Sequence, residues 1–90
     1  MGQLANLPNI GKVVEEQLNR VGIETTEQLV QTGTENAWLK IQSIDSSACI
    51  HRLLALEGAI RGIKKNDIPA ERKEELKDFY NSHKKLKPSH

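Results

Sequence analysis

The side chains that could carry chemistry in this 90-residue sequence are few and scattered. Cys49 and His51 are two residues apart, so on a helix they point to different sides and cannot act together as nucleophile and base. The three histidines, His51, His83 and His90, form no i, i+4 pair and have no carboxylate at the spacing of a metal site. No Walker-type nucleotide-binding loop, no glycine fingerprint after a strand and no paired catalytic carboxylates occur. The sequence therefore predicts no catalytic residue, no metal site, no cofactor and no small-molecule substrate.

Glu57 is the one acidic residue that interrupts the most apolar segment, Ala55-Leu56-Glu57-Gly58-Ala59. A buried carboxylate needs a partner, or else its pKa rises. We expect Glu57 to face the rim of the domain and to meet a basic side chain there, which is a structural role.

The string Leu7-Pro8-Asn9-Ile10-Gly11-Lys12-Val13 predicts a tight turn that opens an amphipathic helix, and it resembles the helix-hairpin-helix motif. In that motif, N–H groups of the hairpin and of the following helix start bind a DNA phosphate without reading the base sequence. Asn9 stands where the motif has its first glycine, and Asn tolerates a left-handed backbone. Glu15 and Glu16 would repel a phosphate near this helix start. The candidate residues for DNA-phosphate binding are Asn9, Gly11, Lys12, Val13, Arg61, Lys64 and Lys65.

The composition is that of one small globular domain, which we expect to span residues 1–90. Hydrophobic residues make up 37% and charged residues 28% of the chain, which excludes the disordered class. No apolar stretch is long enough to cross a bilayer, and no signal peptide is visible. The lone cysteine, Cys49, excludes an internal disulfide and suits a reducing compartment. These features predict a cytoplasmic protein.

The charges are distributed unevenly along the chain. Residues 1–60 carry four basic and seven acidic side chains, a net charge of −3, whereas residues 61–90 carry nine basic and five acidic ones, a net charge of +4. Two clusters, Arg61/Lys64/Lys65 and Lys84/Lys85/Lys87, hold much of the excess. We interpret these clusters as solvated helix ends, where basic residues complement the helix dipole. A basic surface for nucleic acid is the alternative.

Glycine, proline and capping residues divide the chain into five predicted helices. The first begins after residues 8–11 and ends at Gly22. Thr25 or Thr26 caps the second, with Gln28 placed three residues after Thr25 as in a capping box.

Gly33 ends this second helix, and Thr34 caps the third. The apolar face of the third helix consists of Ala37, Ile41 and Ile44, beside Trp38. The last helix begins near Pro69 and ends at Pro88. It carries Leu76, Phe79, His83 and Leu86 along one side, with Tyr80 adjoining.

The fourth helix, roughly residues 47–64, is expected to be buried at the centre of the fold. One face of this helix carries a stripe of apolar residues, namely Cys49, Leu53, Leu56, Ile60 and Ile63. Further apolar residues beside this stripe widen the apolar surface of the helix. Gly58 and Gly62 would let another helix approach closely. No segment alternates as a half-buried strand does. The predicted class is an all-α bundle of about five helices in a helix-hairpin-helix or SAM-like arrangement.

About residues 4–82 resemble the C-terminal domain of the TfoX (Sxy) family of bacterial competence regulators. The matching strings are Asn6-Leu7-Pro8-Asn9-Ile10-Gly11, Gly22-Ile23, Thr26-Glu27-Gln28-Leu29, Ala37-Trp38-Leu39, Leu53-Leu54-Ala55-Leu56-Glu57-Gly58-Ala59-Ile60-Arg61-Gly62 and Asn66-Asp67-Ile68-Pro69. The resemblance implies a compact five-helix fold, a link to the regulation of DNA-uptake genes and no catalytic residue. Family regulators carry a separate N-terminal domain, whereas this sequence opens directly on the matching part, which implies a stand-alone copy.

These observations favour a non-catalytic regulatory or interaction module that acts by protein–protein contact, with a second copy of the chain, in a homodimer, as one candidate partner. Apolar side chains left exposed beside the fourth helix would form the contact surface. The interface candidates are Trp38, Ile50 and Leu54. The alternative function is non-specific binding of the DNA backbone through the hairpin.

Overall fold

The computed structural model describes residues 4–83, and all of its regular elements are helical. A 3₁₀ turn, η1 (Leu4–Asn6), precedes the helices α1 (Lys12–Arg20), α2 (Thr26–Thr32), α3 (Thr34–Ile44) and α4 (Ile50–Arg61). A second 3₁₀ turn, η2 (Lys65–Asp67), leads to α5 (Ala70–His83). The described part of the chain contains no strand, so the predicted all-α class with five helices is confirmed. Leu86, Pro88, His90 and the lysines at 84, 85 and 87 lie outside the described residues.

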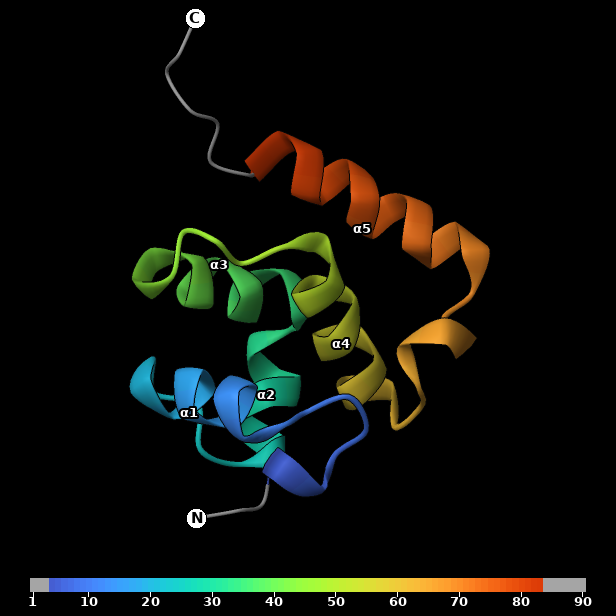
Figure 1. Cartoon of the computed structure of the whole chain (residues 1–90). Coiled ribbons are helices and arrows are strands. Elements are labelled where there is room, and N and C mark those ends of the chain that lie inside the picture. The colour runs from blue at the N-terminus through green and yellow to red at the C-terminus, as the bar shows by residue number, and fades with distance from the viewer. Residues whose placement is uncertain (1–3, 84–90) are drawn as a thin grey trace, which may run out of the picture.

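Helix α4 lies in the middle of the fold, as expected. It contacts α2, α3, α5 and η2, with α5 along one side of the molecule and α1 and α2 toward the other (Figure 1). It spans Ile50–Arg61 and is shorter than the predicted 47–64. A turn at Asp45 delays its start, because the Asp45 side chain accepts a hydrogen bond from the Ser47 N–H at 3.0 Å. Gly62, with a left-handed φ of 75°, ends it.

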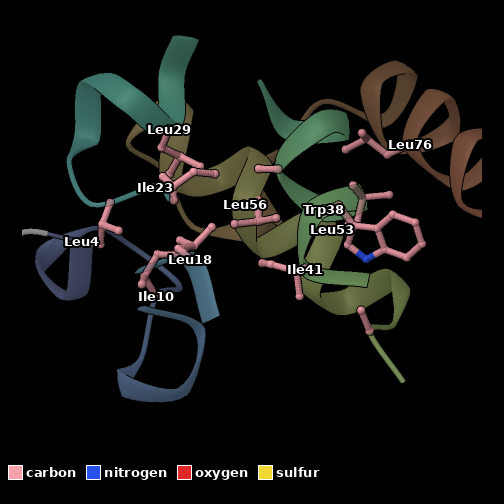
Figure 2. Packing of buried hydrophobic residues seen from close by; sticks show 13 residues of the cluster. Leu4, Ile10, Leu18, Ile23, Leu29, Trp38, Ile41, Leu53, Leu56 and Leu76 are labelled. Carbon is pink, nitrogen blue, oxygen red and sulfur yellow. The ribbon is translucent and has the colours of Figure 1, made fainter. Parts of the chain in front are cut away.

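A single apolar core joins the N-terminal hairpin to α5 (Figure 2). Helices α3 and α4 supply its centre, where Trp38, Ile41, Leu53 and Leu56 are fully buried. The other members of the core are Leu4, Ile10, Leu18, Ile23, Leu29, Ala37, Ala48, Ala59 and Leu76. Cys49 is half-buried and is the N-cap residue of α4 rather than a member of a stripe inside that helix.

The predicted capping box at the start of α2 is confirmed. The Thr25 hydroxyl accepts from the Gln28 N–H at 3.1 Å, and the Gln28 side chain accepts from the Thr25 N–H at 3.2 Å. Gly33 ends α2 with a φ of 86°, also as expected. The predicted cap at Thr34 is wrong, since Thr34 is already the first residue of α3 and its side chain makes no cap hydrogen bond.

The two glycines of α4 differ in what they do. A Cβ atom on Gly58 would overlap the side-chain nitrogen of Asn9 and lie 2.7 Å from the Ile63 carbonyl oxygen. Close packing at Gly58 is therefore confirmed, although the neighbour is the N-terminal hairpin rather than another helix. At Gly62 the space around a Cβ atom is open, so this glycine serves the left-handed cap and not close packing.

Within residues 4–83, no helix combines the length and the apolar composition needed to cross a membrane.

Candidate functional site

Glu57 on α4 is the most constrained charged residue of the fold. It is 4% exposed, so the expectation that it faces the rim is wrong, whereas the expected basic partner is present. Arg72 of α5 donates to both carboxylate oxygens at 3.1 Å. The Thr34 hydroxyl donates at 2.7 Å, and Arg61 forms a further ion pair. Glu57 is buried because α3 and α5 close over it and bring Thr34 and Arg72 with them, whereas Arg61 belongs to α4 itself.

The protonation of Glu57 follows from these contacts. Burial raises the pKa of the carboxyl, but hydrogen bonds from Arg72, Arg61 and Thr34 outweigh burial and hold the pKa at about 2. The carboxylate is thus ionised, and both of its oxygens accept hydrogen bonds from protein groups. This arrangement stabilises the packing of α5 on α4 and does not suit a general base, which needs an accessible oxygen and a higher pKa.

The same network extends across the surface of α5. Arg72 also forms ion pairs at 3.0 Å with Glu35 of α3 and with Glu75 of α5. One guanidinium therefore joins three helices. Arg61 belongs to the candidate DNA-binding set, but its guanidinium is already paired with Glu57, which reduces what it can offer a phosphate.

Asn9 of the hairpin has a structural task that the sequence did not reveal. Its backbone is left-handed, with a φ of 70°. Its side-chain nitrogen donates to the Ile63 carbonyl at 3.0 Å, and its side-chain oxygen accepts from the Lys65 N–H at 3.1 Å. Because both polar atoms are engaged, the Asn9 side chain fastens the hairpin to the segment after α4. Binding of a phosphate by the backbone N–H groups of the hairpin stays a prediction.

This contact joins the hairpin to the backbone of Lys65, another of the DNA-phosphate candidates. Lys65 lies against the hairpin through its backbone, and Lys64 beside it is exposed. At the start of α1, Gly11, Lys12 and Val13 are exposed, and no side chain caps the helix. The acidic Glu15 and Glu16 lie within the first turns of the same helix, which lowers the positive potential at this end.

Trp38 is fully buried, so its prediction as an interface residue is wrong. Its indole N–H donates to the Cys49 carbonyl at 3.2 Å. Its rings meet those of Phe79 and Tyr80 of α5 edge to face, with centroid distances of 6.0 and 5.6 Å. Trp38 is thus a buried core residue against which α5 packs through Phe79 and Tyr80.

Ile50 and Leu54, the other two interface candidates, lie at a surface groove of about 300 Å³ between α4 and α5. Both side chains are half-buried and pack against the core. The residues lining the groove are Ile50, Leu54, Lys73, Glu74, Lys77, Tyr80 and Asn81. Sequence reasoning did not find the contribution of α5, because the pairing of α4 with α5 depends on tertiary packing. Among the described residues, no group of three His, Cys, Asp or Glu side chains could hold a metal ion.

Comparison with known proteins finds relatives in bacteria. The family model described as the TfoX C-terminal domain matches residues 1–80. Protein Sxy of Escherichia coli (strain K12) is 34% identical over 80 residues, which are 89% of this chain and 38% of Sxy. The chain therefore spans well under half of the length of that curated relative.

Two crystal structures of proteins from Listeria monocytogenes are similar over most of the chain. The first is the structure of an uncharacterised protein in a triclinic form, with a TM-score of 0.87 and 46% sequence identity. The match covers 88% of this chain and 90% of the Listeria chain. The other, of a protein of unknown function in a tetragonal form, has a TM-score of 0.85 and 45% identity and covers 87% of this chain and 96% of its own.

Proposed function

Because the chain belongs to the TfoX C-terminal domain family, we propose that it is a non-catalytic regulatory module of the bacterial cytoplasm that acts by protein–protein contact. The observation that carries this proposal is the α4–α5 groove, at which Ile50 and Leu54 are half-buried beside Tyr80. Apolar side chains at a concave surface are typical of contact sites. Its biological setting, as the family implies, is the regulation of competence or transcription.

The charged groups of the interior support a binding role over a catalytic one. Glu57 is saturated with donors from Arg72, Arg61 and Thr34. A catalytic site needs polar groups that converge on a reacting atom and remain accessible to it. The groove instead has an apolar floor with lysine and glutamate side chains at its edge, which suits the surface of another protein.

The experiment is quantitative affinity capture from a bacterial lysate with the tagged chain and two variants, Leu54→Asn and Val30→Asn. Val30 is a matched control because it is 50% exposed on α2 and does not line the groove. Circular dichroism first establishes that both variants are folded. The proposal expects proteins, including untagged copies of the chain, that bind the wild type and Val30→Asn but are lost with Leu54→Asn. Equal recovery with all three baits would overturn it.

One observation favours a second candidate, binding of the DNA backbone. The Asn9 bridge holds the hairpin against the backbone at Ile63 and Lys65, close in sequence to Lys64 and to the start of α1. Free N–H groups at a helix start and nearby lysines can bind a phosphate. Glu16, exposed on the first turns of α1, opposes this function. If the chain binds the DNA backbone, Lys64→Glu should abolish binding of duplex DNA. If it does not, Lys64→Glu should leave the proteins recovered by affinity capture unchanged.

A further inference from the structure

The edge of the groove formed by α5 carries two opposite charges one helical turn apart. Glu74 and Lys77 are both exposed and both line the groove. Within residues 4–83 neither forms an ion pair, since the carboxylate that Arg72 reaches on this helix is that of Glu75. The groove therefore presents a negative and a positive group that the fold leaves to solvent.

The order of charges along α5 is complementary to itself. Lys73 and Asp78 are equally distant from the point between residues 75 and 76, and so are Glu74 and Lys77. When two copies of α5 lie antiparallel and cross at this point, Lys73 opposes Asp78 of the second copy and Glu74 opposes Lys77 of the second copy. A two-fold symmetric contact requires such self-complementarity, because each side supplies the same surface.

The apolar part of the groove supplies the area that such a contact would bury. Ile50, Leu54 and Tyr80 are half-buried around about 300 Å³ of open space. The α5 helix of a second copy would cover them, and the aliphatic stems of Lys73 and Lys77 would add to the apolar surface. Exposed ion pairs contribute little affinity, so burial of these side chains drives association while the charges fix its register.

We propose that the α4–α5 groove binds a second copy of this chain, with the two α5 helices antiparallel and with reciprocal Glu74–Lys77 pairs across the two-fold axis. This inference rests on the proposed function, because it names the occupant of the same groove. An acidic peptide would suit the lysines but not Glu74, whereas a second copy offers each charge its opposite.

The test is sedimentation equilibrium of the wild type, of Glu74→Lys and of Lys77→Glu, up to millimolar protein concentration. The wild type is expected to dimerise. Each single variant places like charges across the axis and should weaken the dimer about tenfold or more. Lys40→Glu is the matched control, because Lys40 is exposed on α3 outside the groove. It should dimerise like the wild type.

Mixing the variants gives the decisive result. Glu74→Lys has lysines at both positions 74 and 77, and Lys77→Glu has glutamates at both. A mixture of the two variants should therefore form a heterodimer, although each variant alone dimerises only weakly. The double variant carrying both changes should regain the wild-type dimer. Both positions are exposed, so loss of folding does not complicate the outcome.

Three results would overturn the inference: a wild type that stays monomeric, single variants that dimerise equally well, or a mixture that does not associate. If the chain is monomeric but Leu54→Asn still loses a captured protein, the second copy is excluded and the proposed function stands. If Leu54→Asn also leaves capture unchanged, the groove is not a contact surface at all.

Discussion

Arg72 of α5 donates to both carboxylate oxygens of the buried Glu57 on α4, each at 3.1 Å. This bidentate contact connects the two helices that form the groove. It is reinforced by the Thr34 hydroxyl at 2.7 Å. The geometry of the groove therefore depends on an ion pair inside the fold as well as on the apolar core.

Removal of the Arg72 guanidinium should destabilise the fold. In Arg72→Met, the buried Glu57 loses its principal donor, and we expect the free energy of unfolding to fall by about 3 kcal/mol. Urea unfolding followed by circular dichroism measures this change. The double variant Glu57→Met/Arg72→Met removes both charges and should be more stable than Arg72→Met alone. A double variant that is less stable would contradict the role given to the buried charge.

The stability should fall in acid because of Glu57. Its pKa in the folded chain is about 2, below the ordinary 4.5, so the unfolded chain takes up the proton first as the pH falls. The stabilisation is complete above 4.5 and is lost as the pH falls toward 2, by up to about 3 kcal/mol. Urea unfolding at several pH values should show a smaller acid loss in Glu57→Gln than in the wild type. Equal losses in both proteins would be evidence against this pKa.

Gly58→Ala should destabilise the fold although alanine favours helices. The helix gains about 1 kcal/mol of propensity. The added methyl group overlaps Asn9 and the Ile63 carbonyl oxygen, and we expect a net loss of about 2 kcal/mol. Thermal unfolding measures it. Asn9→Gly keeps the left-handed backbone and removes the side chain, so the double variant should lose less than the sum of the single losses. Additive losses would show that the two residues are not coupled.

The fluorescence of the single tryptophan, Trp38, should report burial. Because Trp38 is 0% exposed and lies beneath Phe79 and Tyr80, acrylamide should quench it far less than free tryptophan. Quenching should rise in urea together with the loss of helix. Strong quenching in the folded chain would mean that α5 does not cover Trp38.

Local features of the fold were predictable from the sequence. The spacing of apolar residues and the capping box of Thr25 with Gln28 depend on interactions within one helix, and they place the helices within a few residues of their observed bounds. A turn motif such as residues 7–13 can likewise be found without tertiary information. The positive φ of Asn9 agrees with its place in that motif.

Tertiary contacts explain the predictions that failed. Trp38 has the size and amphipathic character of an interface residue, but α5 covers it. Glu57 was expected at the rim because an unpaired buried charge is costly, and its partner Arg72 lies fifteen residues away on another helix. Periodicity shows which face of a helix is apolar and not which element covers it. Periodicity could therefore identify Ile50 and Leu54 as apolar residues of α4. It could not identify the side of the groove that α5 forms.

The choice between protein contact and DNA can be tested by fluorescence anisotropy of labelled duplex DNA, titrated with the chain at two salt concentrations. If the chain acts by protein contact, the anisotropy stays flat at low salt and high protein concentration. Micromolar binding that weakens steeply with salt, and that Lys12→Glu abolishes, would contradict protein contact as the function and make the hairpin the functional site.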